Sequence, residues 1–516
     1  MRVTRRRLIQ LLGTGSVAAS AVVLAACGET KVVEKIVTQT VEKVVTKEVE
    51  KVVTKEVPVE KIVTKEVEKV VTKEVPVEKI VTKEVIKEVT APQKAARVPV
   101  RFMNYWAAGA RKENMDRGLV EFAKRYPDIT LKIETLPPGF YDDKINIMFA
   151  AGTIGDVLVM NGADMLEHTA DVLPLADQFK KAGLNIDDYL VLAREQPDKP
   201  DLENLSVKGV LYGFPFMSGC SGWLYNVSLF EKAGVPNPDA KWTWATVLDN
   251  AKKLTKADKS SYGLWHRDGA EFDWMVFISQ NGGWLFSEKN RPPKSSGFAT
   301  QGGIEAFQYF VDAIHKHKVS PAPAEIPSLL SEGITDLFAT GKVGMLPGGI
   351  HGPGSREQQI KTRFVWDNMP TPLSNKGKLA FSTNELGHYI SRWSTDRGSV
   401  EDAFTLISFI GGDYFQGLIA DWRGAIPMFK KLIESDRWLK PIPGRALPKS
   451  MNIITDNFRS KENYGLMFFD GWSQWWQILT SGMQAALIGE APAADTIKKV
   501  EAETNKFLAG LATKKK

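Results

Sequence analysis

The feature that most constrains the fold of this chain is a tandem duplication near its N-terminus. The segment VEKVVTKEVPVEKIVTKE occupies residues 49–66 and recurs without a substitution at residues 67–84. Neighbouring positions of a packed core need side chains of different shapes, so two identical segments in a row cannot build one. We therefore expect residues 49–84 to lie outside any folded domain.

The repeat favours an extended backbone. Between residues 42 and 88 every Lys has an odd number and every Glu an even number, so an extended chain would carry them on opposite sides. Val, Ile and Thr favour this backbone, Pro58 and Pro76 would interrupt a helix, and the apolar period is not the seven of a coiled coil. Either a solvated low-complexity linker or a paired β-stalk fits the pattern. Both are spacers, and residues 31–93 could reach roughly 200 Å at about 3.3 Å per residue.

The first residues have the composition of an export signal. MRVTRRRLIQLLGTGSVAASAVVLAACGET begins with basic residues, continues with an apolar run and reaches small residues before Cys27. The stretch 24–27 (LAAC) resembles a bacterial lipobox, which implies cleavage before Cys27 and lipid on the new N-terminal cysteine. Residues 4–9 (TRRRLI) resemble a twin-arginine export motif, and Sec export stays an alternative. An uncleaved membrane helix over residues 8–25 is the rival interpretation.

Composition excludes several classes of protein. The chain has two cysteines, and once Cys27 carries lipid, Cys220 has no disulfide partner and is expected to be a small buried apolar residue. The net charge of +6 comes without a basic, aromatic-interleaved surface, so no nucleic-acid partner is expected. His315 and His317 are two apart, which turns them to different sides of a helix. No phosphate-binding or metal-ligating motif occurs, so we expect no cofactor and no metal.

Strands and helices alternate from residue 98 onward, which predicts an α/β fold. The predicted strands are 98–103, 129–133 and 156–160, and the predicted helices are 112–124 and 140–151. Ligands usually bind at loops that follow the carboxyl ends of such strands. Those loops carry polar and aromatic side chains here, namely Tyr105, Trp106, Asn161 and Asp164.

Five ordered motifs resemble a known family. They are VLYGFPFMSGCSGWLYNVSLFEKAG at 210–234, WTW at 242–244, NGG at 281–283, GKVGM at 341–345 and GAIP at 424–427. Their order and spacing resemble the sugar-type extracellular solute-binding proteins of ABC importers, over essentially 97–510. The resemblance implies an α/β fold of two lobes, of the type II periplasmic-binding-protein kind, with a ligand cleft at a multi-strand hinge.

The resemblance also implies a domain organisation and a function. The expected parts are a signal peptide (1–26), a lipid-anchored repeat stalk (27–96), lobe 1 (97–215 plus 366–405) and lobe 2 (216–365 plus 406–516). The expected function is that of a non-enzymatic, monomeric, extracytoplasmic protein that captures a carbohydrate and delivers it to the permease subunits of an ABC importer. Rival functions are binding of a peptide or organic anion by the same fold, glycan cleavage at the cell surface, and a scaffolding role.

Tryptophans are the most informative candidate ligand contacts, because a flat aromatic ring can cover the apolar face of a sugar. Trp472 and Trp476 share a helical face with Trp475, and a stripe of core residues is the alternative interpretation. By the resemblance, Trp476 aligns with a sugar-stacking aromatic of the maltodextrin-type members. Trp265 and Trp274 lie in a segment that presents another aromatic in those members. Glu271, beside Trp274, is either a hydroxyl acceptor or a loop charge.

Other candidates come from stretches that pass the cleft in the family. Trp422 and Arg423 precede the GAIP motif, and Asn384 and Glu385 fall in the returning hinge strand. His351 stands where maltodextrin binders place a stacking Trp, a departure that argues against a maltose-like ligand. The complete predicted ligand-binding set is Tyr105, Trp106, Asn161, Asp164, Ser218, Trp265, Glu271, Trp274, Gly348, His351, Asn384, Glu385, Trp422, Arg423, Trp472 and Trp476.

Overall fold

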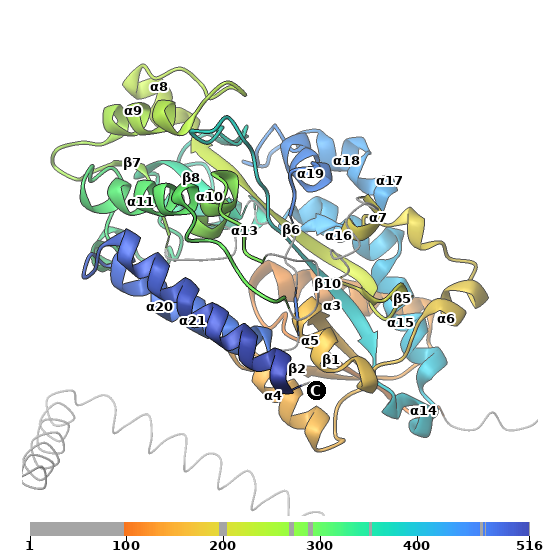
Figure 1. The fold of residues 1–516 in the computed structure, drawn as a ribbon. Helices are drawn as coiled ribbons and strands as arrows, with labels where there is room; N and C mark the ends of the chain where they lie inside the picture. The colour runs from red at the N-terminus through yellow and green to blue at the C-terminus, as the bar shows by residue number, and fades with distance from the viewer. Residues whose placement is uncertain are drawn as a thin grey trace, which may run out of the picture. The chain divides into compact units, whose positions relative to one another are not determined.

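The computed structural model describes residues 97–195, 204–267, 273–286, 293–349, 353–464, 468–469 and 471–514. These residues belong to one compact unit that begins at Lys94 (Figure 1). The predicted signal peptide, Cys27 and the repeat lie outside the described residues.

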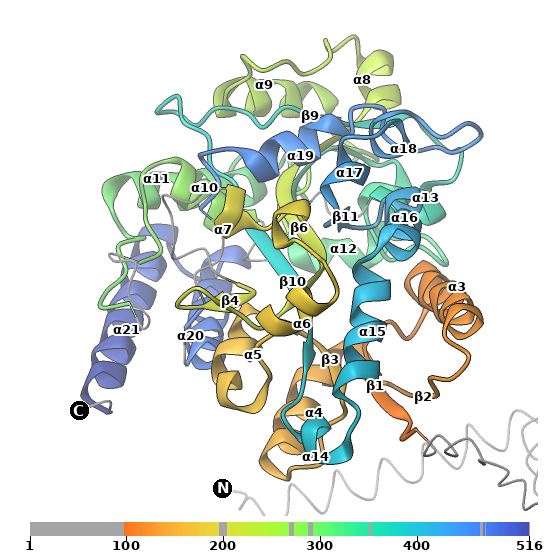
Figure 2. The ribbon, with the colours of Figure 1, turned by 90° about the vertical axis from the view of Figure 1, so that its right-hand side faces the viewer.

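One strand runs through both parts of the sheet. β6 (Phe214–Asn226) is buried along its whole length and shows no alternation of polar and apolar residues, as expected for a strand covered on both faces. Its first half pairs with β10 (Thr383–Ile390), and its second half pairs with β8 (Val343–Gly349) and β9 (Trp366–Met369). β6 therefore connects two half-sheets (Figure 2).

The first half-sheet is mixed. β2 (Leu131–Thr135), β1 (Val100–Asn104) and β3 (Val157–Asn161) pair in parallel, and β10 joins β3 antiparallel. β11 (Ile426–Pro427) pairs with β6 at Met217 and Ser218. The second half-sheet adds β7 (Tyr262–Leu264), parallel to β8. The short hairpin β4 (Ser206–Val207) and β5 (Val210–Leu211) stands apart.

Helices cover these half-sheets. In the chain up to β6 they are α3 (Gly109–Arg125), α4 (Pro138–Ala150), α5 (Gly162–Glu167), α6 (Ala176–Lys181) and α7 (Leu192–Glu195). Between β6 and β9 they are α8 (Val227–Ala233), α9 (Trp244–Leu254), α10 (Met275–Gln280), α11 (Gln301–His315), α12 (Ile326–Leu329) and α13 (Pro353–Ile360). After β10 they are α14 (Trp393–Arg397), α15 (Val400–Gly411), α16 (Asp413–Trp422), α17 (Lys430–Ile433), α18 (Asp436–Leu439), α19 (Asn452–Arg459), α20 (Trp472–Leu487) and α21 (Ala493–Lys514).

The apolar side chains form separate cores on the two half-sheets. The first core combines β1, β3 and the start of β6 with α15 and α16. Another combines the end of β6 with α9, α10, α11, α20 and α21, and a third fills the space around β8, β9 and α19. Most buried apolar residues of α15 and α16 belong to the first core, whereas Ala420 and Ile426 belong to the third. The predicted lobe boundaries stay a prediction.

Within the described ranges, no single helix combines the length and the apolar character needed to cross a bilayer. Only the consecutive pair α15 and α16 meets that test jointly, and the two are bent by 41°. Buried side chains of both helices belong to the first core, including Ile407, Ile410, Phe415 and Ile419.

Candidate functional site

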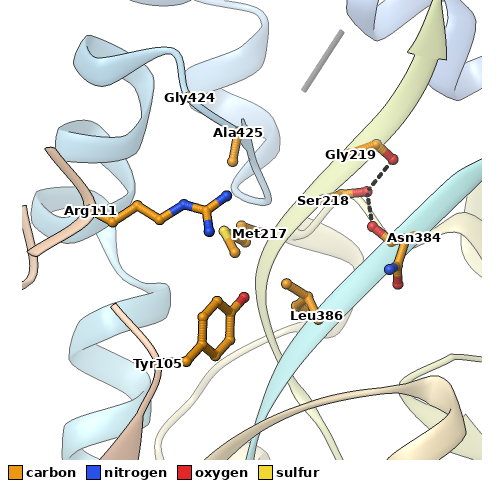
Figure 3. A pocket seen from close by; sticks show the side chains of 9 residues that line it. All are labelled: Tyr105, Arg111, Met217, Ser218, Gly219, Asn384, Leu386, Gly424 and Ala425. Atoms are coloured by element: carbon orange, nitrogen blue, oxygen red, sulfur yellow. Dashed lines mark hydrogen bonds between the residues drawn. The ribbon is translucent and has the colours of Figure 1, made fainter. Parts of the chain in front are cut away.

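A pocket of about 110 Å³ opens where β1, β6, β10 and β11 approach one another. Its lining comes from segments far apart in the sequence, and Figure 3 shows Arg111, Tyr105, Met217, Leu386 and Ala425 around one space, with Ser218, Gly219 and Asn384 on its β6–β10 side. The lining residues are Tyr105, Arg111, Met217, Ser218, Gly219, Asn384, Leu386, Gly424 and Ala425. Apolar surfaces of Met217, Leu386 and Ala425 therefore face the same space as hydroxyl, amide and guanidinium groups.

The loop after β1 presents Tyr105 to this pocket because the next residue is anchored in the core. Trp106 is 1% exposed and contacts Phe216 and Trp422, with ring centroids 5.1 and 5.5 Å away. Asn104 accepts a hydrogen bond from the backbone N–H of Trp106 at 3.0 Å and so holds the bend of the loop. Trp106 and Trp422 thus support the pocket from behind.

The paired strands β6 and β10 supply the polar wall. The Ser218 hydroxyl donates to the backbone oxygen of Asn384 at 3.0 Å and lies 3.3 Å from that of Gly219 (Figure 3). The side-chain oxygen of Asn384 is buried and has no hydrogen-bond partner among the described residues. A buried acceptor of this kind is rare in a finished core and is suited to a ligand donor.

Gly424 closes the pocket above the Trp422 ring. A Cβ at this position would lie 2.0 Å from ring atoms of Trp422, so glycine is needed for this close approach. Arg423 is fully buried, has φ of 57°, and donates to the backbone oxygens of Arg437 and Lys440. Arg423 thus holds the turn before Gly424. The predicted contacts Trp422 and Arg423 are not part of the pocket lining.

Burial shapes the electrostatics beside the pocket. It raises the pKa of the Tyr105 phenol to about 12, with Arg111 acting in the opposite direction, so this hydroxyl stays neutral. Burial also raises the pKa of the Asp164 carboxyl to about 8, and the charge of Asp142 adds to the shift. Asp164 forms a capping box with Asn161 at the start of α5, where its carboxylate accepts from the Asn161 N–H at 3.4 Å.

The structure brings three members of the predicted set together in the pocket, namely Tyr105, Ser218 and Asn384. Glu385 faces elsewhere: it is fully buried and accepts hydrogen bonds from the backbone of Leu192 at 2.7 Å and from the Asn204 amide at 3.4 Å. Alternation along β10 explains why Asn384 and Glu385 point to opposite sides. Asn161 and Asp164 are occupied by their capping box.

The predicted tryptophans of the second half-sheet lie away from this pocket. Trp274 is 1% exposed and packs against Phe307, and Trp265 is buried in the third core. Trp472 is buried and stacks on the partly buried Trp476, with centroids 5.7 Å apart and planes 19° apart. Ligand contact by these rings stays a prediction.

Three further predicted residues are Gly348, Glu271 and His351. Gly348 has φ of 116°, and a Cβ there would lie 2.1 Å from the Arg267 guanidinium, which is paired with Asp273 at 3.0 Å. Glu271 and His351 lie outside the described residues. No group of His, Cys, Asp or Glu in the described part of the chain is arranged to hold a metal ion.

The sequence missed Arg111, Met217, Gly219, Leu386, Gly424 and Ala425 as pocket residues. For Arg111 a signal existed, since it follows the aromatic loop in the first turn of α3. Gly424 and Ala425 directly follow the predicted contacts Trp422 and Arg423, so the sequence indicates the right stretch but not the residues that line the pocket.

The sequence profile of the bacterial extracellular solute-binding proteins matches residues 102–393, more than half of the chain. The chain belongs to this family. Relatives of this solute-binding protein include the arabinooligosaccharide-binding protein of Bacillus subtilis, 27% identical over 233 residues, 43% of this chain and 49% of that protein. The lactose-binding protein of Rhizobium radiobacter is 21% identical over 334 residues, 63% and 74% of the two chains. The chain spans about half the length of the first of these relatives.

Solved structures agree on the fold. An ABC substrate-binding protein from Listeria monocytogenes, in complex with cycloalternan, superimposes with a TM-score of 0.67 at 22% identity, covering 80% of this chain and 99% of that one. The predicted two-lobe α/β fold is thereby confirmed. The family and these neighbours are binding proteins, so the solute-binding protein is not an enzyme.

Proposed function

We propose that this protein captures a carbohydrate in the pocket between β6, β10 and the loop after β1, and delivers it to an ABC importer. The observation that carries the proposal is the lining of that pocket. Tyr105 and Met217 offer apolar surface, and Ser218, Asn384 and Arg111 offer hydrogen-bonding groups. A sugar has an apolar C–H face and a rim of hydroxyls, so it needs both kinds of surface.

The proteins that this chain resembles include saccharide-binding proteins. The two named relatives bind an arabinooligosaccharide and lactose, according to their names, and the solved neighbour holds cycloalternan. The pocket volume of about 110 Å³ is several times the roughly 10–15 Å³ that a single water needs, so it has room for a small polar group larger than water. We propose that this group is part of a free sugar, a glycoside or an oligosaccharide.

Attachment to the membrane completes the proposal. Cys27 carries the lipid, residues 28–96 form the spacer, and the binding domain works outside the cytoplasm at the end of that spacer. Labelled fatty acid should be incorporated by the wild type and not by Cys27→Ala, and the variant should be released from membranes. Persistent membrane attachment of the unlabelled variant would favour an uncleaved N-terminal helix.

A thermal-shift screen tests the choice of ligand. A compound that binds only the folded protein raises its melting temperature, and the shift grows with the logarithm of the ratio of ligand concentration to Kd. We expect shifts with mono- or oligosaccharides and a Kd of about 10⁻⁵ to 10⁻⁷ M. If peptides or amino acids shift the melting temperature and no saccharide does, the ligand is a peptide or an amino acid and the proposal of a carbohydrate is wrong.

A further inference from the structure

Arg111 is the one charged side chain in the lining of the pocket, and no carboxylate accompanies it among the described residues. It extends from the first turn of α3 into the space between Tyr105 and Ala425 (Figure 3). The other eight lining residues are uncharged at neutral pH. The pocket therefore presents one unopposed positive charge to whatever occupies it.

Arg111 makes no hydrogen bond and no ion pair with any described residue. Other buried or partly buried arginines of the same domain have partners: Arg423 donates to backbone oxygens, and several others pair with acids. Arg101 pairs with Glu134 at 2.9 Å, Arg356 with Asp336 at 2.8 Å and Arg397 with Asp156 at 2.7 Å. A partly buried guanidinium without a carboxylate retains five N–H donors arranged for a planar oxyanion.

Nearby acids do not neutralise this charge inside the pocket. Glu385 is next to the pocket residue Asn384, but its two oxygens accept from Leu192 and Asn204 on the other side of β10. Asp142 and Asp164 raise the pKa of Tyr105, yet neither residue lines the pocket. Asp164 is also held by its capping box with Asn161.

We propose that the pocket takes a carbohydrate bearing an anionic group, either a phosphate ester or a carboxylate, and that Arg111 binds this group. This inference rests on the proposed function and narrows its ligand class. Ser218 and Asn384 on the opposite wall bind hydroxyls of the sugar, while the guanidinium forms paired hydrogen bonds to two oxygens of the anion. Tyr105 and Met217 cover the apolar face between them.

Matched ligands test the charge requirement. Glucose, galactose and mannose are titrated beside their 1-phosphates and uronic acids, with glycerol 3-phosphate as a small phosphate ester. We expect at least one anionic member to bind about 10- to 100-fold more tightly than its neutral counterpart, the range for a hydrogen bond to a charged group. Its Kd should rise with salt concentration, because screening weakens charge attraction. Comparison of the sugar phosphates with the uronic acids shows whether the pocket prefers a phosphate ester or a carboxylate.

Variants of two arginines on the same helix assign the effect. Arg111→Gln should weaken the preferred anionic ligand about 10- to 100-fold and leave its neutral counterpart within about twofold. Arg111→Lys should restore part of the loss, since it keeps the charge without the planar fork. Arg117→Gln, on the exposed face of α3, is the matched control and should bind as the wild type does. Melting temperatures of all three variants show whether they are folded.

The outcomes separate this inference from the proposed function. Neutral sugars binding as tightly as their anionic partners, or equal losses for both in Arg111→Gln, would overturn the inference and leave carbohydrate binding intact. No binding of any saccharide in the panel, with binding of peptides or amino acids, would overturn both.

Discussion

At the scale of single residues, two adjacent tryptophans offer a direct comparison of core and surface. Trp475 is fully buried on α20, whereas Trp476 is partly exposed and stacks on Trp472. Trp475→Ala should lower the free energy of unfolding by about 3–5 kcal/mol. Trp476→Ala should lower it much less, and should cost about 1–3 kcal/mol of binding if its ring covers a sugar. Denaturant unfolding and ligand titration of both variants distinguish a core role from a ligand-binding role. If both variants lose the same stability and keep the wild-type affinity, Trp476 is a core residue and does not contact the ligand.

Asp164 should make stability depend on pH. Its folded-state pKa of about 8 lies above the ordinary value near 3.9, so the folded protein retains a proton that the unfolded chain releases. The free energy of unfolding should therefore fall as pH rises from about 4 to 8, by up to about 1.4 kcal/mol per pH unit from this group. Asp164→Asn removes the titration and should flatten the profile. Parallel profiles of wild type and variant between pH 4.5 and 8 would contradict a raised pKa.

The predictability of the pocket residues follows from what each does locally. Tyr105 was predicted because an aromatic after a strand has no packing purpose, and it lines the pocket. Trp106 has the same sequence context, yet its ring points into the core against Phe216. The sequence cannot show which of two adjacent loop side chains enters the core, because this depends on the bend of the loop that Asn104 holds. Gly424 depends on the distant Trp422 ring in the folded state, which no local pattern reports.

At the scale of elements, β6 joins the half-sheets. The thiol of its Cys220 can be used to test whether this strand stays closed in the native protein. Cys220 lies in β6 opposite Thr383 of β10, is fully buried, and has a pKa raised by burial to about 12. At pH 8 the Cys27→Ala variant should react with a thiol reagent about a thousandfold more slowly when native than when unfolded, given the lower thiolate fraction. Reaction at similar rates would show that β6 opens readily in the native protein.

The regular elements at the start of the domain were predictable because each has one local pattern. The expected helices 112–124 and 140–151 correspond to α3 and α4, and the expected strands correspond to β1, β2 and β3, with ends shifted by one or two residues for most. β6 was not identified as a strand across both half-sheets. Its sequence has no alternation of polar and apolar residues, because both faces of the strand are buried along its whole length.

At the scale of the whole molecule, the chain divides into two units, Met1–Gln93 and Lys94–Lys516. The folded unit begins at Lys94, and the pocket residues fall between Tyr105 and Ala425. From the sequence we predict a boundary between residues 96 and 97, since the repeated segment cannot build a core. The predicted lobe boundary between residues 405 and 406 stays a prediction, because the packing of α15 and α16 in the first core depends on long-range contacts that no local sequence pattern reports.

Deletion of residues 49–84 should therefore leave ligand affinity unchanged. The deletion removes both copies of the repeat and none of the residues that line the pocket or pack behind it. In solution, with Cys27→Ala in both proteins, the Kd of the preferred ligand and the melting temperature should match those of the intact chain. In cells, the lipid-bearing deletion should lower uptake of the ligand, because a shorter tether reduces the reach of the domain from the membrane. A weaker Kd in solution would show that the repeat contributes to the folded domain, contrary to its role as a spacer.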